Sequence, residues 1–151
     1  MLQLARESDW EDVRRLSVQV HNLHVSWRPD LYVHCEEPYP KEVYLEDIRK
    51  RMVYVAKLEN QVMGYVVLAV KQKDGPGRVP RKILLLETIC VEETIRGHGI
   101  GKEMLMDVRA LSKAFGCAEV MLGVHPENEI ALGFYQKCGF QINTINMQIK
   151  N

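Results

Sequence analysis

The sequence predicts one α/β domain in which helices flank a central sheet. The chain has 151 residues, which is the length of a single domain. Segments with the two-residue period of strands alternate with segments at helical spacing. No internal repeat, low-complexity tract or linker interrupts this pattern. We therefore expect residues 1–151 to form one domain with about four helices.

The N-terminal part is expected to contain a short strand and two helices. Residues 2–5 alternate apolar and polar side chains, which is typical of a strand. Ser8 and Glu11 have the spacing of a capping box and predict the start of a helix. The core face of that helix carries Val13, Leu16, Val20 and Leu23. A second helix is predicted over residues 41–50. Its inward side chains are Tyr44, Leu45 and Ile48.

A hairpin and a central strand are expected next. Residues 53–58 and 62–70 are apolar runs joined by a connection of hairpin length. Residues 73–80 are rich in Gly and Pro and predict a turn. Residues 83–91 are nearly all apolar, as in a strand that is covered on both faces. The carboxylate of Glu87 in the middle of this strand therefore needs an explanation.

The C-terminal third is expected to alternate helix and strand. A helix is predicted over residues 102–115 and ends at Gly116. Its buried side chains are Met104, Val108, Leu111 and Phe115. A strand over residues 120–124 and a helix over residues 127–138 follow. The inward side chains of this last helix are Ile130, Ala131 and Phe134.

The last residues of the sequence change their apolar phase. Phe140 and Ile142 fall on one parity, whereas Ile145, Met147 and Ile149 fall on the other. A bulge or turn at residues 143–144 is required if one face is buried throughout. The eleven residues after Phe140 are too few for two full strands. We expect either one bent strand that closes the sheet or a partner chain that completes it, as in a homodimer.

Composition narrows the possible partners and the location. Lys plus Arg number 20 and Asp plus Glu number 20, so no overall field attracts the chain to nucleic acid or to an anionic membrane. The N-terminus has no apolar signal core, and no run approaches the ~18 apolar residues of a membrane span. The four cysteines show no CxxC pairing. We expect a cytoplasmic protein that binds neither nucleic acid nor membrane.

A glycine-rich turn follows the predicted central strand. Its residues are Arg96, Gly97, His98, Gly99, Ile100 and Gly101. The glycines let the backbone approach a ligand closely, and the next helix aims free N–H groups and its positive dipole end at the same place. An anion is therefore the expected ligand. The turn is not a Walker A loop, because Lys102 is followed by Glu103, and Lys102 also replaces the third Gly of the dinucleotide fingerprint.

Arg96, Gly99 and Gly101 form the pattern R-x-x-G-x-G, which resembles the pyrophosphate-binding motif of the GNAT superfamily of N-acetyltransferases. A second similarity lies downstream, where Asn128 and Tyr135 are seven residues apart, as in another motif of the family. The resemblance implies a GNAT fold, with a mixed, mostly antiparallel central sheet flanked by about four helices. It also implies acetyl-CoA as the cosubstrate and no metal.

The resemblance implies a role for each part of the site. Backbone N–H groups of the six turn residues would hold the pyrophosphate of coenzyme A. A bulge in the fourth strand would free the N–H groups of Ile89 and Val91 for the pantetheine arm and for the thioester oxygen, where negative charge grows in the transition state. Asn128 would contact the pantetheine or CoA, and Tyr135 would protonate the departing thiolate.

The sequence leaves the general base open. An alkylamine has an ordinary pKa of about 10.4, so at neutral pH it has to lose a proton before it attacks. Glu87 is the first candidate, because partial burial would make its carboxylate a stronger base. His125 is the second, because Gly123 occupies the position where other members carry their base. A water relay is the third. Cys90 is expected to lie in the core and to form no covalent intermediate.

The acceptor pocket is expected in residues 21–39, which prolines break into a loop between the first two helices. In the family this segment shapes the pocket, and acidic side chains suit a cationic amine. The implied substrate-binding residues are Trp27, Arg28, Asp30, Tyr32 and Glu36. The same segment has a histidine and cysteine cluster whose spacing matches no common zinc pattern. These residues are His21, His24, His34 and Cys35.

Together, the motifs predict an N-acetyltransferase that moves an acetyl group from acetyl-CoA to a primary amine of a small molecule or peptide. The predicted mechanism is direct attack in a ternary complex. Two alternatives are an acyltransferase that uses another acyl-CoA and a sensor that binds acyl-CoA without turnover. The presence of both Glu87 and Tyr135 argues against the sensor.

Overall fold

The centre of the computed structural model, which describes residues 1–151, is a five-stranded sheet in the order β1-β2-β3-β4-β5. The strands are β1 (Leu2–Leu4), β2 (Val53–Leu58), β3 (Gln61–Lys73), β4 (Arg81–Val91) and β5 (Glu119–Met121). Neighbouring strands from β1 to β4 are antiparallel, whereas β5 runs parallel to β4. The predicted mixed, mostly antiparallel sheet is therefore confirmed.

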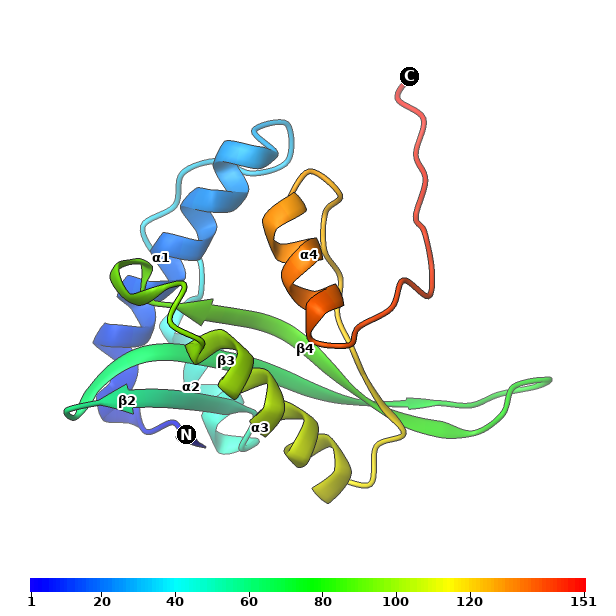
Figure 1. Cartoon of the computed structure of the whole chain (residues 1–151), viewed down its shortest axis with the longest axis horizontal. Helices are drawn as coiled ribbons and strands as arrows, with labels where there is room; N and C mark the ends of the chain where they lie inside the picture. The colour runs from blue at the N-terminus through cyan, green and yellow to red at the C-terminus, as the bar shows by residue number, and fades with distance from the viewer.

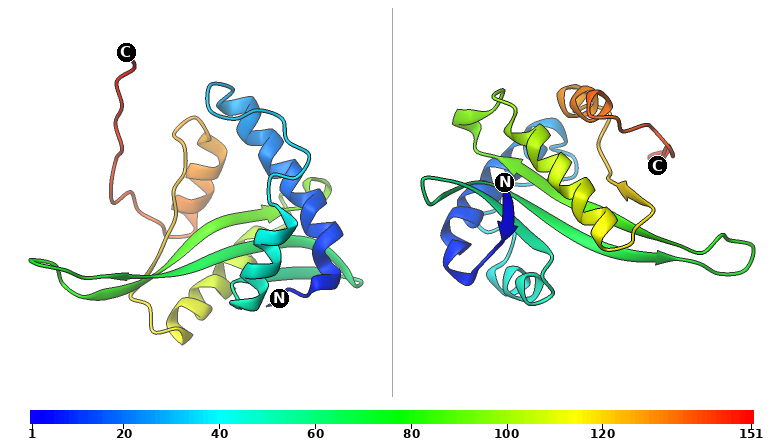
Figure 2. Two further views of the ribbon diagram at one scale, coloured as in Figure 1. Left: turned by 180° about the vertical axis from the view of Figure 1, so that it is seen from behind. Right: turned by 60° about the horizontal axis from the view of Figure 1, so that its bottom comes forward.

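Helices cover both faces of the sheet (Figures 1 and 2). Helices α1 (Trp10–Trp27) and α2 (Lys41–Arg49) pack on one face, and α3 (Ile100–Ala114) and α4 (Glu129–Lys137) lie on the other. Buried side chains form a separate core on each face, with Leu16 and Tyr44 in one and Met104 and Val108 in the other. No helix has the length and apolar character needed to cross a bilayer.

Helix α1 begins and ends differently from the prediction. A 3-10 turn (Glu7–Asp9) precedes it, and the carboxylate of Asp9 accepts a hydrogen bond from the backbone N–H of Arg6 at 2.9 Å. The predicted Ser8 capping box is therefore wrong, because the buried Asp9, paired with Lys57 at 2.7 Å, takes that place. At the other end the helix continues to Trp27, through the first part of the predicted loop.

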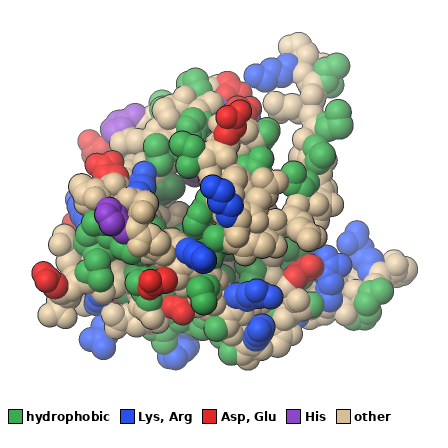
Figure 3. All heavy atoms as spheres, in the orientation of Figure 1, with side chains coloured by type: hydrophobic (Ala, Val, Ile, Leu, Met, Phe, Trp, Pro, Cys, Tyr) green, Lys and Arg blue, Asp and Glu red, His purple; other side chains and the backbone are tan.

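Strands β3 and β4 continue beyond the predicted limits of 62–70 and 83–91 into a hairpin that projects from the sheet (Figure 1). The extension consists of polar, mostly exposed residues that keep the backbone ladder, for example Lys73 opposite Arg81. Backbone pairing, which needs no apolar pattern, extends the strands here. Lys and Arg side chains gather over this hairpin (Figure 3).

Strand β5 is shorter than the predicted strand over residues 120–124. It pairs with β4 only from Ile83 to Leu85, and after Met121 the chain leaves the sheet. Helix α4 begins at Glu129, and Ile130 is 86% exposed, so its predicted inward orientation is wrong. Only the C-terminal half of α4 packs on the sheet, through side chains such as Phe134 and Tyr135.

Residues 141–151 form no strand, and they extend away from the sheet (Figure 1). The apolar side chains of this segment are 61% to 92% exposed. The predicted bent strand with a bulge at residues 143–144 is therefore wrong within this chain, because the buried face that required it is missing. An ion pair between Lys150 and Asp30, at 3.3 Å, is the contact that holds the end of the segment to the loop after α1.

Candidate active site

A cleft of about 1290 Å³ opens where β4 and the residues after β5 separate. Because β5 stops pairing at Leu85, the second half of β4 has one free edge. The N-terminus of α3, residues 122–125 and α4 line the cleft on one side, and α1 and α2 line it on the other. Its volume exceeds the roughly 300–1,000 Å³ of typical ligand pockets, which leaves space for a cofactor and an acceptor together.

A bulge lies in β4 beside this free edge. Leu68 is opposite Leu86 and Val67 is opposite Thr88, so Glu87 has no partner on β3. Because of this extra residue, the side chains after the bulge point to the opposite side of the sheet from the one that their sequence parity would give. Leu86 packs in the α3 core, whereas Cys90, which is an even number of residues away, packs in the α1 core. The family resemblance implied a bulge in the fourth strand, and the structure has one.

The N–H groups of Ile89 and Val91 point to the free edge of β4. The N–H of Glu92 donates to the carbonyl of Met63 at 2.7 Å, which makes this pair a hydrogen-bonded pair of the antiparallel ladder. Hydrogen-bonded and non-bonded pairs alternate along an antiparallel ladder, so Cys90 also bonds to β3. Ile89 and Val91 lie at the non-bonded positions, and their N–H and C=O groups therefore point away from β3. The side chain of Arg96 donates to the Val91 carbonyl at 2.8 Å, which agrees with this direction.

The glycine-rich turn directs the start of α3 toward the cleft. Gly97 and Gly99 have φ of +83° and +86°, which side chains rarely adopt, and Gly99 is the N-cap of α3. A Cβ atom on Gly101 would lie 3.2 Å from the ring of Phe134, so this glycine also allows α4 to pack closely. His98 turns to the carbonyl of Ile95 at 3.1 Å and does not line the cleft, whereas the other turn residues do.

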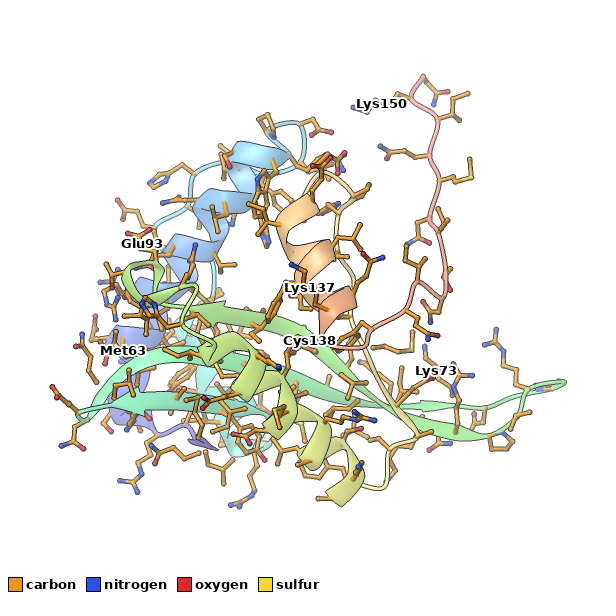
Figure 4. The ribbon with its side chains drawn as sticks, viewed as in Figure 1. Met63, Lys73, Glu93, Lys137, Cys138 and Lys150 are labelled. Carbon is orange, nitrogen blue, oxygen red and sulfur yellow. The ribbon has the colours of Figure 1, made fainter.

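Side chains from α1 hold the segment before the turn. Glu92 is only 6% exposed, forms an ion pair with Arg15, and accepts a hydrogen bond from Gln19 at 2.9 Å. The oxygen of Gln19 accepts the backbone N–H of Glu93 at 3.1 Å. Figure 4 shows Glu93 and Met63 at the same end of the sheet. Helix α1 therefore fixes the position at which the turn begins.

Tyr135 and Asn128 both lie on the α4 side of the cleft. Tyr135 is half-buried between Phe134 and Phe140, and burial raises the pKa of its phenol above the ordinary value of 10.0. It therefore carries its proton at neutral pH. Asn128 is the N-cap of α4, and its side-chain oxygen accepts the N–H of Ala131 at 3.1 Å. Its amide NH₂ is the group left for a ligand.

The two predicted bases have different surroundings. Glu87 lies at the bulge and lines the cleft, but its side chain is exposed and makes no hydrogen bond or ion pair, so the expected partial burial is absent. His125 has both ring nitrogens near a partner, since the Tyr32 hydroxyl lies 3.3 Å from Nε2 and Arg28 lies 3.4 Å from Nδ1.

Sequence reasoning missed His24 as a proton acceptor. Its ring lines the cleft and lies 5.3 Å from that of Tyr32. Burial, together with His125 and His21, lowers the pKa of His24 below 6.5, so the ring is neutral at neutral pH. The available signal was the spacing of His21, His24 and Trp27, which place them on one face of a helix.

Two of the five predicted acceptor residues, Trp27 and Tyr32, line the cleft. Arg28 instead forms an ion pair with Asp30 at 2.8 Å, and this hydrogen bond lowers the pKa of the Asp30 carboxyl. Glu36 is exposed and lies outside the cleft lining. Tyr39, at the end of the predicted segment, also lines the cleft, and so does Asp47, which the sequence did not indicate. The histidines and cysteine of this segment form no group of three or more side chains able to hold a metal.

Comparisons with known proteins agree with this geometry. The model of the acetyltransferase (GNAT) family matches residues 17–140. The glucosamine 6-phosphate N-acetyltransferase of Trypanosoma brucei brucei is 29% identical over 110 residues, which cover 70% of this chain and 71% of the relative. The spermine/spermidine N(1)-acetyltransferase of Bacillus subtilis is 26% identical over 130 residues, which cover 81% of this chain and 79% of the relative.

Solved structures show the same fold. A tetramutant of the BH1408 protein from Bacillus halodurans has a TM-score of 0.94 at 27% identity, over 100% of this chain and 99% of that one. An aminoglycoside N-acetyltransferase in complex with CoA has a TM-score of 0.71 at 18% identity, over 100% of this chain and 93% of that one. The family match, the free edge of β4 and the glycine-rich turn lead to one conclusion: the chain belongs to the GNAT acetyltransferase family and is an acetyl-CoA-dependent N-acetyltransferase.

Proposed function

We propose that the protein transfers the acetyl group to a primary amine of a small molecule or peptide by direct attack in a ternary complex. The observation that carries the proposal is the free edge of β4, where the N–H groups of Ile89 and Val91 face a cleft that also contains Tyr135. Fixed N–H donors of this kind stabilise the negative charge that develops on a thioester oxygen.

The residues of the cleft fit coenzyme A. Arg96, Lys102 and Lys137 are its basic lining residues, and the first two belong to the turn and the first residues of α3. Figure 4 shows Lys137 near the C-terminal end of α4. The free N–H groups at the start of α3 and these charges suit the pyrophosphate. Ile89, Val91 and the Asn128 amide suit the polar groups of the pantetheine arm.

The proposed chemical step forms a C–N bond and breaks a C–S bond. The amine loses a proton before or during attack, and the acceptors at hand in the cleft are Glu87, His24 and His125, directly or through water. The leaving sulfur takes the proton of the Tyr135 hydroxyl, which its raised pKa keeps in place at neutral pH. Cys90 is 3% exposed in the α1 core and takes no part in this step.

The proposal is tested by measuring thiol release from acetyl-CoA with a panel of amines. We expect release that depends on the amine and that survives Cys90→Ala. Tight CoA binding without release for any amine would favour the sensor, and faster release from propionyl-CoA than from acetyl-CoA would favour another acyl group. Loss of transfer in the Cys90→Ala variant, with the fold intact, would refute direct attack.

We also propose a homodimer in which residues 141–151 of each chain pair with the open sheet edge of the other chain. The exposed Ile145, Met147 and Ile149 share one parity, and β5 pairs on one side only, with β4. An exposed strand edge and an apolar strand-like segment are suited to pairing between chains. A monomeric mass in solution at micromolar concentration would contradict this proposal.

A cytoplasmic location is part of the proposal. All four cysteines, Cys35, Cys90, Cys117 and Cys138, are unpaired in the structure. Free thiols of this kind suit a reducing compartment.

A further inference from the structure

The end of the cleft between α1 and α2 contains a carboxylate without a cationic partner. Asp47 lies on α2, is half-buried and lines the cleft. It accepts a hydrogen bond from the Tyr39 hydroxyl at 2.6 Å, and no Lys or Arg side chain comes within 4.0 Å of it. A half-buried carboxylate with only a phenol partner retains an uncompensated negative charge.

Aromatic rings surround this carboxylate. Tyr39 stacks on Tyr65 with a centroid distance of 6.3 Å and meets Tyr44 edge to face at 5.9 Å. Burial, followed by the hydrogen bond to Asp47, raises the pKa of Tyr39, so its phenol stays a hydrogen-bond donor to the carboxylate. Ring faces beside a carboxylate are the surroundings that bind an ammonium group.

The charges that line the cleft are separated along its length. The basic residues Arg96, Lys102 and Lys137 belong to the glycine-rich turn, α3 and α4. The acidic residues are Asp47 on α2 and Glu87 at the β4 bulge. One region of the cleft therefore suits phosphate groups and the other suits cations, and an acceptor with its own phosphate is disfavoured next to the two carboxylates.

We propose that Asp47 and the ring of Tyr39 bind a second ammonium group of the acceptor, so that the preferred acceptor is a diamine or a longer polyamine. One amine would lie near Glu87, where it is acetylated, and the other would neutralise Asp47. This inference rests on the proposed function. A monoamine of the same length would leave the Asp47 charge unpaired and would bind more weakly.

The test compares pentylamine with diaminopentane carrying an amino group at each end. Thiol release from acetyl-CoA gives kcat/KM for both amines in the wild type and in Asp47→Asn. We expect the diamine to be preferred, and Asp47→Asn to reduce its kcat/KM about tenfold to a hundredfold, since a hydrogen bond between charged groups is lost. The values for pentylamine and the KM for acetyl-CoA should not change.

Two further variants serve as controls. Glu46→Gln removes the neighbouring carboxylate of α2, which pairs with Arg49 and Lys50 at the surface, and should leave the preference for the diamine intact. Tyr39→Phe keeps the ring and removes the hydrogen bond to Asp47, and it should reduce the preference less than Asp47→Asn does.

Calorimetric binding of the two amines to both proteins gives a readout that does not depend on turnover. Equal binding of diamine and monoamine by the wild type, or an equal effect of Asp47→Asn on both, would overturn the inference. Absence of thiol release with every amine, combined with stronger diamine binding, would instead contradict the proposed function and leave the cation site standing.

Discussion

Replacing Gly64 by alanine tests whether β3 holds the backbone of β4 in the position that the cleft needs. A Cβ atom on Gly64 would lie 2.9 Å from the carbonyl oxygen of Cys90 and 2.9 Å from Sδ of Met104. The methionine side chain is flexible and can move, but the carbonyl is part of the sheet. That carbonyl and the N–H of Val91 belong to one planar peptide unit, so displacing the oxygen also turns the N–H.

The size of the effect follows from these contacts. Overpacking costs about 1–3 kcal/mol, and the loss of glycine freedom in the unfolded chain returns about 0.4–1 kcal/mol, so values near the middle of both ranges leave a net destabilisation of about 1–2 kcal/mol. For a chain of 151 residues this lowers Tm by about 2–8 °C. We also expect a higher KM for acetyl-CoA at an unchanged KM for the amine, because the N–H of Val91 is one of the groups proposed to bind the cofactor.

Differential scanning calorimetry and acetyl-CoA titration measure the two effects. Gly133→Ala is the matched control, because this glycine lies inside α4 and a Cβ atom there meets nothing within 4 Å. Higher helix propensity should raise the stability of that variant by up to about 1 kcal/mol. If Gly64→Ala changed neither Tm nor the affinity for acetyl-CoA, the reasoning about the Cys90 peptide would be refuted.

Three other changes test the site. Tyr135→Phe removes the proposed proton donor but keeps the ring, so kcat should fall about a hundredfold or more with little change in Tm, and a normal kcat would exclude this residue as the acid. Burial lowers the pKa of His24 below 6.5, so on acidification the unfolded chain binds the proton first and the folded state loses stability as the pH falls below 6.5. Urea midpoints should show this loss, and His24→Gln should reduce it; an unchanged pH dependence would contradict the assignment. Gln19→Ala removes the hydrogen bonds to Glu92 and Glu93, so KM for acetyl-CoA should rise about threefold to tenfold, while an unaffected KM would show that the turn is held without α1.

Elements with a strong local pattern were predictable from the sequence. The strand over residues 53–58 was predicted with the bounds it has, since an apolar run between turn residues needs no further information. The errors lie where tertiary structure decides. Residues 122–124 are apolar but line the cleft instead of extending β5, and Ile130 is exposed because only the far half of α4 reaches the sheet.

The residues of the site likewise divide into those indicated by local sequence and those placed by tertiary structure. The glycine-rich turn and Tyr135, which line the cleft, could be singled out beforehand because their signals are short stretches of sequence. Asp47 and His24 were missed because their places in the cleft depend on how α1 and α2 cross the sheet. Prolines in residues 21–39 suggested a loop, which concealed the helical spacing of His24 and Trp27 on the last turns of α1.

The bulge in β4 makes the number of residues in this strand more important than their identity. Substituting Glu87 removes one candidate proton acceptor but keeps the backbone, whereas deleting it would exchange the two faces of everything that follows. Cys90 would turn from α1 to the opposite core, and the N–H of Ile89 would enter the ladder instead of facing the cleft. Relatives should therefore keep the number of residues between Leu86 and the glycine-rich turn, and a sequence alignment that places a gap there assigns the wrong backbone groups to the edge that faces the cleft.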